Sequence, residues 1–120
     1  MSYDNNNIFA KILRGEIPCK KIYEDDFVLS FYDINPQKKT HALVIPKGKY
    51  VDLDDFSINA SSDEMVGLLK GINAVAKKLR ISVDTGKGYR ALTNISEHGG
   101  QEVPHLHFHL FGGENVGKMV

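Results

Sequence analysis

Residues 105–110 read His-Leu-His-Phe-His-Leu, a strict alternation of imidazole and apolar side chains. Successive side chains on a β-strand point to opposite faces, so a strand here would place all three histidines on one face. The apolar face must be buried against another layer, and the histidine face must line a second surface. Three imidazoles at this spacing have no packing rationale, because Val or Thr would form a better sheet. The pattern therefore indicates that the histidine face of this strand forms a functional site.

The rest of the chain predicts an α+β domain that spans residues 1–120. Hydrophobic spacing and turn residues predict helices at residues 6–14 and 62–80 and strands at residues 20–24, 27–34, 41–46, 89–95 and 105–111. Residues 47–60 and 96–100 are expected to be loops. Strands joined by short turns, together with two helices, imply a five-stranded, mainly antiparallel sheet with the helices packed on one face.

The second helix carries the clearest local signals. Ser61 and Glu64 fit a capping box, which satisfies main-chain N–H groups at the start of a helix. An apolar stripe follows at helical spacing. Its members are Met65, Leu68, Leu69, Ile72, Val75, Ala76 and Leu79. Gly67 and Gly71 weaken this helix, and they are compatible with the close approach of another backbone.

Composition excludes several classes of partner. The chain has 15 Lys and Arg against 15 Asp and Glu, so it lacks the basic cluster that binding to DNA or RNA requires. Small phosphate ligands remain possible, because a few N–H groups can hold one phosphate. The single cysteine, Cys19, excludes an intramolecular disulfide and a Cys-rich zinc site. A polar N-terminus and the lack of a long apolar run predict a cytoplasmic protein that does not bind membranes.

The histidines of residues 105–109 leave three interpretations open. They could be polar surface residues, which is a poor explanation for three in alternation. They could bind zinc through neutral imidazoles, with Glu102 or another acid as a further ligand. They could also form a nucleophilic histidine with acid–base partners around a reacting phosphate. The acidic residues Asp52, Asp54 and Asp55 are interpreted as a solvated face rather than as a metal site.

Four stretches together resemble the histidine triad family of nucleotide hydrolases and transferases, in particular its Hint-like purine nucleoside phosphoramidase branch. Residues 105–111 match its H-φ-H-φ-H-φ-φ signature, where φ is apolar. The stretches are IFAKILRGEIP (8–18), FYDINPQKKTHALVIPK (31–47), GYRALTN (88–94) and GGQEVPHLHFHLFGG (99–113).

The resemblance implies a mononucleotide cleft across the histidine face. His107 would attack the α-phosphorus and form a nucleotidyl-histidine intermediate that water then hydrolyses. His105 would support the orientation of His107, while His109 and His41 would contact the phosphate or the leaving group. A histidine at position 109, where uridylyltransferase relatives carry Gln, favours hydrolysis over transfer. A departing amine needs only a proton, so neither a metal nor another cofactor is required.

The resemblance also implies residues that hold the nucleotide. Asp33 would bind the ribose hydroxyls, Asn94 the phosphate, and Gly100 would offer a main-chain N–H. The base would be enclosed by Phe9, Ile12, Phe31, Ile34 and Leu43, although their apolar pattern alone predicts core residues. Glu102 occupies a position where many relatives carry a small hydroxyl residue. Its charge beside a phosphate puts the leaving-group preference and the rate in question.

The resemblance further implies a homodimer in which two five-stranded sheets join into ten strands, with contacts through the long helix and the strand at residues 89–95. The expected activity is hydrolysis of adenosine 5′-phosphoramidates and of acyl- or aminoacyl-adenylates, with release of AMP. Two alternatives stay open. One is a purine-nucleotide-binding regulatory module with incidental catalysis, and the other is a diadenosine polyphosphate hydrolase.

Overall fold

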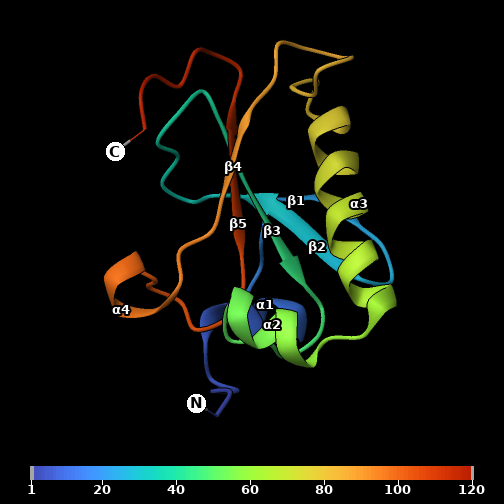
Figure 1. The fold of residues 1–120 in the computed structure, drawn as a ribbon, viewed down its shortest axis with the longest axis vertical. Coiled ribbons are helices and arrows are strands. Elements are labelled where there is room, and N and C mark those ends of the chain that lie inside the picture. The colour runs from blue at the N-terminus through green and yellow to red at the C-terminus, as the bar shows by residue number, and fades with distance from the viewer. Residues whose placement is uncertain (1, 120) are drawn as a thin grey trace.

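The computed structural model describes residues 2–119 and contains a five-stranded antiparallel sheet with four helices (Figure 1). The elements in chain order are α1 (Ile8–Leu13), β1 (Lys21–Glu24), β2 (Val28–Tyr32), β3 (Thr40–Pro46), α2 (Leu53–Asn59), α3 (Ser62–Lys78), β4 (Arg90–Leu92), α4 (Ser96–Gly99) and β5 (Phe108–Gly112). Within residues 2–119, none of the helices has the length and apolar character needed to cross a bilayer.

The strand order is β1-β2-β3-β5-β4, so the last strand of the chain lies inside the sheet. It pairs with β3 on one side, where His41 faces Phe111 and Leu43 faces His109, and with β4 on the other. The link between β1 and β2 is one of the short turns expected between the strands. There the Asp25 carboxylate accepts hydrogen bonds from the main-chain N–H groups of Phe27 and Val28 at 2.8 and 2.9 Å. This antiparallel architecture is the one predicted from the sequence.

The helices cover both faces of the sheet, which corrects the expectation that they pack on one face. On one face, Leu106 and Leu110 pack with Ala42 and Val44 of β3, with α3 and with Phe56 of α2. On the other face, Phe9 of α1 packs with Leu29, Phe31, Leu43 and Ile45. The histidines lie on this second face, since Leu43 and His109 are directly paired. The smaller apolar cluster therefore borders the candidate site.

Helix α3 begins with the predicted capping box, with Ser61 and Glu64 each bonded to the other's main-chain N–H. Most of its predicted stripe is buried, but Leu69 is 67% exposed. Gly67 and Gly71 face the sheet. A Cβ atom at Gly67 would lie 2.4 Å from the Phe27 ring, and one at Gly71 would lie 2.6 Å from a Val28 methyl group. The two glycines thus leave room for the side chains of Phe27 and Val28, and not for the close approach of another backbone.

Two segments expected as loops contain short helices. In α2, the Asp52 side chain caps the helix by accepting from the N–H of Asp55 at 2.8 Å, while Asp55 accepts from the N–H of Val51 at 2.7 Å. The acidic cluster therefore forms the N-terminal end of a helix. The Asp-x-x-Asp spacing of Asp52 and Asp55 is compatible with such a helix cap. In α4, Ser96 and Gly100 both adopt positive φ angles, of 58° and 74°. This turn shortens β4 from the expected 89–95 to Arg90–Leu92.

The final strand begins three residues later than predicted. Pro104 has no N–H, and the N–H of His105 donates to the carbonyl of Val103 at 2.9 Å. The N–H of Leu106 donates to the carbonyl of Tyr50 at 2.8 Å, outside the sheet ladder. His105 and His107 therefore precede β5, and only His109 lies within it. The alternation of faces persists, because Leu106 and Leu110 are both fully buried in the core.

We expect Gly71→Ala to destabilise the protein although Ala favours helices. The new methyl group would meet Val28, which is itself fully buried in β2 and has no room to move. Overpacking of this kind costs about 1 to 3 kcal/mol, which exceeds the gain of about 1 kcal/mol in helix propensity. Urea unfolding measures the difference. Asn73→Ala, at an exposed position of α3, is the matched control and should leave stability equal or slightly raised. A Gly71→Ala protein as stable as that control would contradict the packing argument.

Candidate functional site

Four of the five histidines form one cluster at the β3–β5 pair. Nε2 of His41 lies 2.9 Å from Nδ1 of His109, and the ring centroids of His107 and His109 are 5.1 Å apart. His105 is linked to His107 through its main-chain carbonyl. His98, in α4, is exposed and forms no hydrogen bond with these residues among residues 2–119. The structure thus brings together the histidines that the sequence predicted for the site.

His107 is held with one nitrogen free. Its Nδ1 lies 2.7 Å from the main-chain carbonyl of His105, and since a carbonyl only accepts, Nδ1 carries the proton. The neutral ring then has an unprotonated Nε2. No buried side-chain N or O of the described residues lacks a partner, and Nε2 of His107 has no partner among residues 2–119. This nitrogen is therefore open to solvent, with a lone pair available to attack an electrophile.

His105 is held at both nitrogens. Nε2 donates to the carbonyl of Pro46 at 2.9 Å, and Nδ1 lies 2.5 Å from the hydroxyl of Tyr3. Because Nε2 carries the proton, Nδ1 of the neutral ring accepts and the Tyr3 hydroxyl donates. The His105 side chain is fully buried. It has no nitrogen left to contact a substrate.

His41 and His109 form a directional pair. The main-chain N–H of Gln37 donates to Nδ1 of His41 at 3.1 Å, so Nε2 of the neutral His41 ring carries the proton. That Nε2–H donates to Nδ1 of His109 at 2.9 Å. The remaining nitrogen of His109, Nε2, then bears a proton. His107 and His109 accordingly offer unlike groups, a lone pair and an N–H donor.

The environment keeps these rings neutral near pH 7. Burial lowers the pKa of His105 and of His109 to about 4. Burial also lowers the pKa of His107, against the opposing effects of its bond to the His105 carbonyl and of the Asp33 and Glu102 charges. For His41, burial lowers the pKa and the charge of Asp33 partly offsets it. Neutral imidazoles are what a histidine nucleophile requires.

Asp33 lies beside the cluster, at the end of β2. Its main-chain N–H donates to the carbonyl of His41, and its Oδ2 lies 3.5 Å from Nε2 of His41. Asp33, His41 and His109 together place three potential ligand atoms within 4.8 Å of one another, so they are a candidate metal-ligand set. The bond from Gln37 argues against it, because Nε2 of His41 carries a proton that a metal would have to displace. The geometry fits a hydrogen-bond network better than a metal centre.

The five predicted base-binding residues are split by the fold. Phe9, Phe31 and Leu43 are buried in the smaller core cluster, and Ile12 packs against it. This is the arrangement that their apolar pattern alone predicts. Ile34 is 91% exposed. Phe9 also borders the site, with its ring edge-on to His107 at a centroid distance of 4.9 Å.

The predicted phosphate-binding residues lie in the loop around α4. A Cβ at Gly99 would be 3.5 Å from the main-chain carbon of Asn94, so this loop folds back on Asn94. Gly100, with φ of 74°, ends α4 and is exposed. Neither Asn94 nor Gly100 is hydrogen-bonded to a histidine within residues 2–119. The N–H of Gly100 donates to the carbonyl of Glu97 at 3.1 Å, so the structure does not offer it to a phosphate as the resemblance implies. Glu102 is exposed, and its charge favours protonation of His107.

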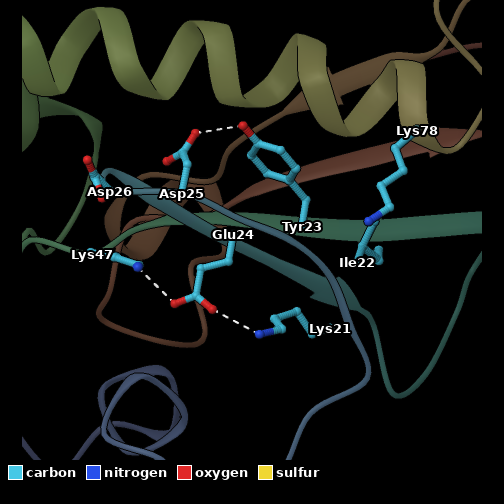
Figure 2. A pocket seen from close by; sticks show the side chains of 8 residues that line it. All are labelled: Lys21, Ile22, Tyr23, Glu24, Asp25, Asp26, Lys47 and Lys78. Carbon is cyan, nitrogen blue, oxygen red and sulfur yellow. Dashed lines mark hydrogen bonds and ion pairs between the residues drawn. The ribbon is translucent and has the colours of Figure 1, made fainter.

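Two surface cavities lie away from the histidines. One, of about 550 Å³, lies along β1 and is lined by Lys21, Ile22, Tyr23, Glu24, Asp25, Asp26, Lys47 and Lys78 (Figure 2). Three of its charges pair with one another, since Glu24 contacts Lys47 at 2.8 Å and Lys21 at 3.0 Å. The other, of about 500 Å³, lies between the end of α1 and β2. The free thiol of Cys19 lines this second cavity, but burial raises its pKa, so it is not activated as a nucleophile. The histidine cluster therefore remains the candidate active site.

Four contacts at the site were not predicted. Tyr3 and the N–H of Gln37 fix histidine tautomers, and Thr93 holds the main-chain carbonyl of His107 at 2.7 Å. Phe111 lies parallel to His109, with a centroid distance of 5.7 Å, and packs on His41 at 4.2 Å. The alternation of residues 105–111 could have placed Phe111 on the histidine face. The other three depend on tertiary contacts that carry no local signal.

Comparison with known proteins agrees with this geometry. The family model described as HIT domain matches residues 14–116. The chain belongs to the HIT domain family. An uncharacterised HIT-like protein from Azospirillum brasilense is 53% identical over 99% of this chain and 95% of its own length. The purine nucleoside phosphoramidase of Escherichia coli is 41% identical, over 94% of this chain and 92% of its own.

A solved structure shows the same fold. The HIT family hydrolase from Clostridium thermocellum superimposes with a TM-score of 0.86 at 36% identity, over 98% of each chain. The HIT domain model covers all four histidines of the cluster and Asp33, but it begins after α1 and Tyr3. The family assignment thus supports the resemblance drawn from the histidine pattern, at the level of a HIT hydrolase-like protein.

We expect the free energy of unfolding to fall as the pH decreases from about 6.5 to about 4. The pKa of His105 and of His109 is about 4 in the folded protein, against about 6.5 in an unfolded chain. Between these values the unfolded chain binds more protons, so stability rises with pH. Each of the two histidines contributes up to about 1.4 kcal/mol per pH unit in this window.

Urea unfolding at several pH values measures this dependence. His109→Gln removes one of the titrating groups and should give a shallower curve between about pH 6.5 and pH 4.5. The effect of Glu24, whose pKa is lowered to about 2 by Lys47 and Lys21, falls below this window. A wild-type protein equally stable at about pH 7 and pH 5 would contradict the assignment of buried neutral histidines.

Proposed function

We propose that this protein hydrolyses adenosine 5′-phosphoramidates, and related acyl- and aminoacyl-adenylates, with release of AMP. The observation that carries the proposal is the Nε2 lone pair of His107, which is held toward solvent by the bond from Nδ1 to the His105 carbonyl. The identity of 41% to a purine nucleoside phosphoramidase supports the choice of substrate.

In the first step, Nε2 of His107 attacks the α-phosphorus. An N–P bond forms to His107 while the bond from phosphorus to the amine breaks, and the departing amine takes up a proton from solvent. The Nδ1–H of His107 remains bonded to the His105 carbonyl, which stabilises the positive charge that develops on the imidazole. In the second step, water attacks phosphorus and loses a proton to solvent, and the bond from phosphorus to Nε2 of His107 breaks. AMP is thereby released, and Nε2 regains its lone pair.

His109 and His41 would serve the phosphate. His109 directs Nε2–H outward because its Nδ1 accepts from His41. This N–H can donate to a phosphate oxygen whose charge grows in the transition state. Asp33 lies 3.5 Å from His41 and favours its charged form, so a proton shared along this row would be stabilised. No step needs a metal ion.

The remaining predicted residues would hold the nucleotide. Asp33 would accept hydrogen bonds from the ribose hydroxyls, and the base would lie against exposed Ile34 and the edge of the Phe9 cluster. Asn94 would contact the phosphate from the loop around α4, whereas the N–H of Gly100 already donates to the carbonyl of Glu97 at 3.1 Å. Glu102, exposed beside this loop, would influence which amine can leave.

We expect His107→Ala to abolish turnover while nucleotide binding persists. The substitution removes the nucleophile but leaves Asp33, Ile34 and His109 in place. Steady-state hydrolysis of a fluorogenic adenosine phosphoramidate and AMP binding by calorimetry measure the two properties separately. The loss in kcat should exceed about a thousandfold, because no other group can form the covalent intermediate. His98→Ala, which removes an exposed histidine outside the cluster, is the control and should retain full activity.

Two outcomes would contradict this proposal. An active His107→Ala enzyme would exclude the covalent mechanism. A wild-type protein that binds AMP but does not turn over the amidate would favour the alternative, a nucleotide-binding regulatory module. A panel of AMP and GMP joined to different amines, together with diadenosine polyphosphates, would identify the preferred substrate.

We also propose that the protein is a cytoplasmic homodimer joined through α3 and β4. Strand β4 is at the edge of the sheet, and Val66 and Leu69, three residues apart on α3, are 51% and 67% exposed. An exposed edge strand and an exposed apolar helix face both favour pairing with another chain. The unpaired Cys19 is consistent with a reducing compartment.

Leu69→Asp is expected to yield a monomer in light-scattering chromatography at concentrations where the wild type is a dimer. A buried charge at the centre of a helix interface leaves an unpaired carboxylate, which costs several kcal/mol. Ile58→Asp, at a 78% exposed position of α2, is the matched control and should remain dimeric. A monomeric wild type, or a dimeric Leu69→Asp variant, would exclude this interface.

A further inference from the structure

Tyr3 joins the N-terminal segment to the centre of the histidine cluster. Its hydroxyl lies 2.5 Å from Nδ1 of His105, and the two rings meet edge to face at a centroid distance of 5.6 Å. The segment that follows is itself anchored. Nδ2 of Asn7 donates to the carbonyl of Asp4 at 2.7 Å, and Arg14 donates to the carbonyl of Asn5 at 2.8 Å. Tyr3 is therefore held in place by turns that lead into α1.

The partner of Tyr3 is a histidine with no remaining function in binding. Nε2 of His105 donates to the carbonyl of Pro46, and Nδ1 accepts from Tyr3. Without the Tyr3 hydroxyl, Nδ1 would be a buried acceptor with no donor, a state that proteins avoid. The ring would then gain by turning or by taking up a proton. Either change would disturb the main chain at His105.

The main chain at His105 is the support of the nucleophile. Its carbonyl accepts from Nδ1 of His107, the bond that directs the free Nε2 toward solvent. Two hydrogen bonds thus connect Tyr3 to the His107 ring, one from Tyr3 to the His105 side chain and one from His107 to the His105 carbonyl. A change in the orientation of the His105 carbonyl would rotate the His107 ring that is bonded to it. Small misplacements of a nucleophile strongly reduce the rate of reaction.

We infer that Tyr3 is a positioning residue for the reaction, because its hydroxyl locks His105 and thereby orients the carbonyl that holds His107. This inference rests on the proposed function for its kinetic consequence, whereas the hydrogen bond itself can be tested without substrate. Tyr3 acts through His105 and does not contact the reacting atoms. It lies ahead of residues 14–116, where the HIT domain model matches.

Tyr3→Phe tests the role of the hydroxyl, because the edge-to-face ring contact survives and one hydrogen bond is removed. Tyr23→Phe is the matched control. It removes the hydrogen bond from Tyr23 of β1 to Asp25, which is 2.8 Å long (Figure 2). This bond lies at the cavity along β1, whose lining contains no histidine. Both variants should lose similar thermal stability. Only Tyr3→Phe should lower kcat, by about threefold to tenfold, with KM changed by less than about twofold.

Nitrogen-15 NMR of the ligand-free proteins provides a readout that stability alone would not move. In Tyr3→Phe, the Nδ1 signal of His105 should shift toward that of a free acceptor, and the ring signals of His107 should broaden. In Tyr23→Phe, both should match the wild type. An unchanged His105 signal in Tyr3→Phe, or an equal loss of kcat in the two variants, would overturn the inference. If the wild type has no phosphoramidase activity, the proposed function fails, and the NMR comparison still decides the role of Tyr3.

Discussion

The antiparallel pairing of β3 with β5 is the constraint on which the rest of the structure depends. It places His41 and His109 on one face, within 2.9 Å of each other, although they are 68 residues apart in the chain. The same pairing turns Ala42, Val44 and Leu110 to the opposite face, where α3 buries them. Since the side-chain period of a strand is two, a slip of one residue would exchange the histidines with the core. The packing of α3 therefore secures the register that assembles the site.

Main-chain groups determine what each imidazole can do. The carbonyl of His105 accepts a hydrogen bond from Nδ1 of His107 and so fixes the proton on that nitrogen. The carbonyl of Pro46 fixes the proton on Nε2 of His105 in the same way. The N–H of Gln37 has the opposite effect on His41, because it requires an acceptor. Each of the four histidines thus has a defined tautomer, with the proton on Nδ1 in His107 and on Nε2 in the other three. Hydrogen bonds determine these tautomers, and the charge of Asp33 lies 3.5 Å from His41. The arrangement is robust near neutral pH, where burial keeps the rings uncharged.

Much of this could be predicted from the sequence, because the signals were local. The capping box at Ser61, the turn at Asp25 and the alternation from His105 to Leu110 each depend on residues within a few positions. The errors have physical causes as well. The sequence does not predict helix α2, because the charges of Asp52 and Asp55 favour a solvated surface as much as a helix cap. The predicted start of β5 is wrong because Pro104 lacks an N–H and the bond from Leu106 to Tyr50 replaces a ladder bond.

The contacts that could not be predicted are those between residues far apart in the sequence. Tyr3 meets His105 across 102 residues, and Thr93 meets the carbonyl of His107 across 14. Neither residue type nor spacing distinguishes them from ordinary surface residues. The histidines were predictable as a set, but their division of labour was not, because it follows from burial and from individual hydrogen-bond partners.

That division follows the order of the motif. His105 is fully buried with both nitrogens bonded, His107 is 6% exposed with one free lone pair, and His109 is more exposed with one free N–H. Along the strand from the interior toward solvent, His105 is therefore the support, His107 the proposed nucleophile and His109 the hydrogen-bond donor. A repeat of one residue type can supply three different functions because each step along the strand meets a different environment. The spacing places the imidazoles side by side, and the surrounding main chain makes them unlike.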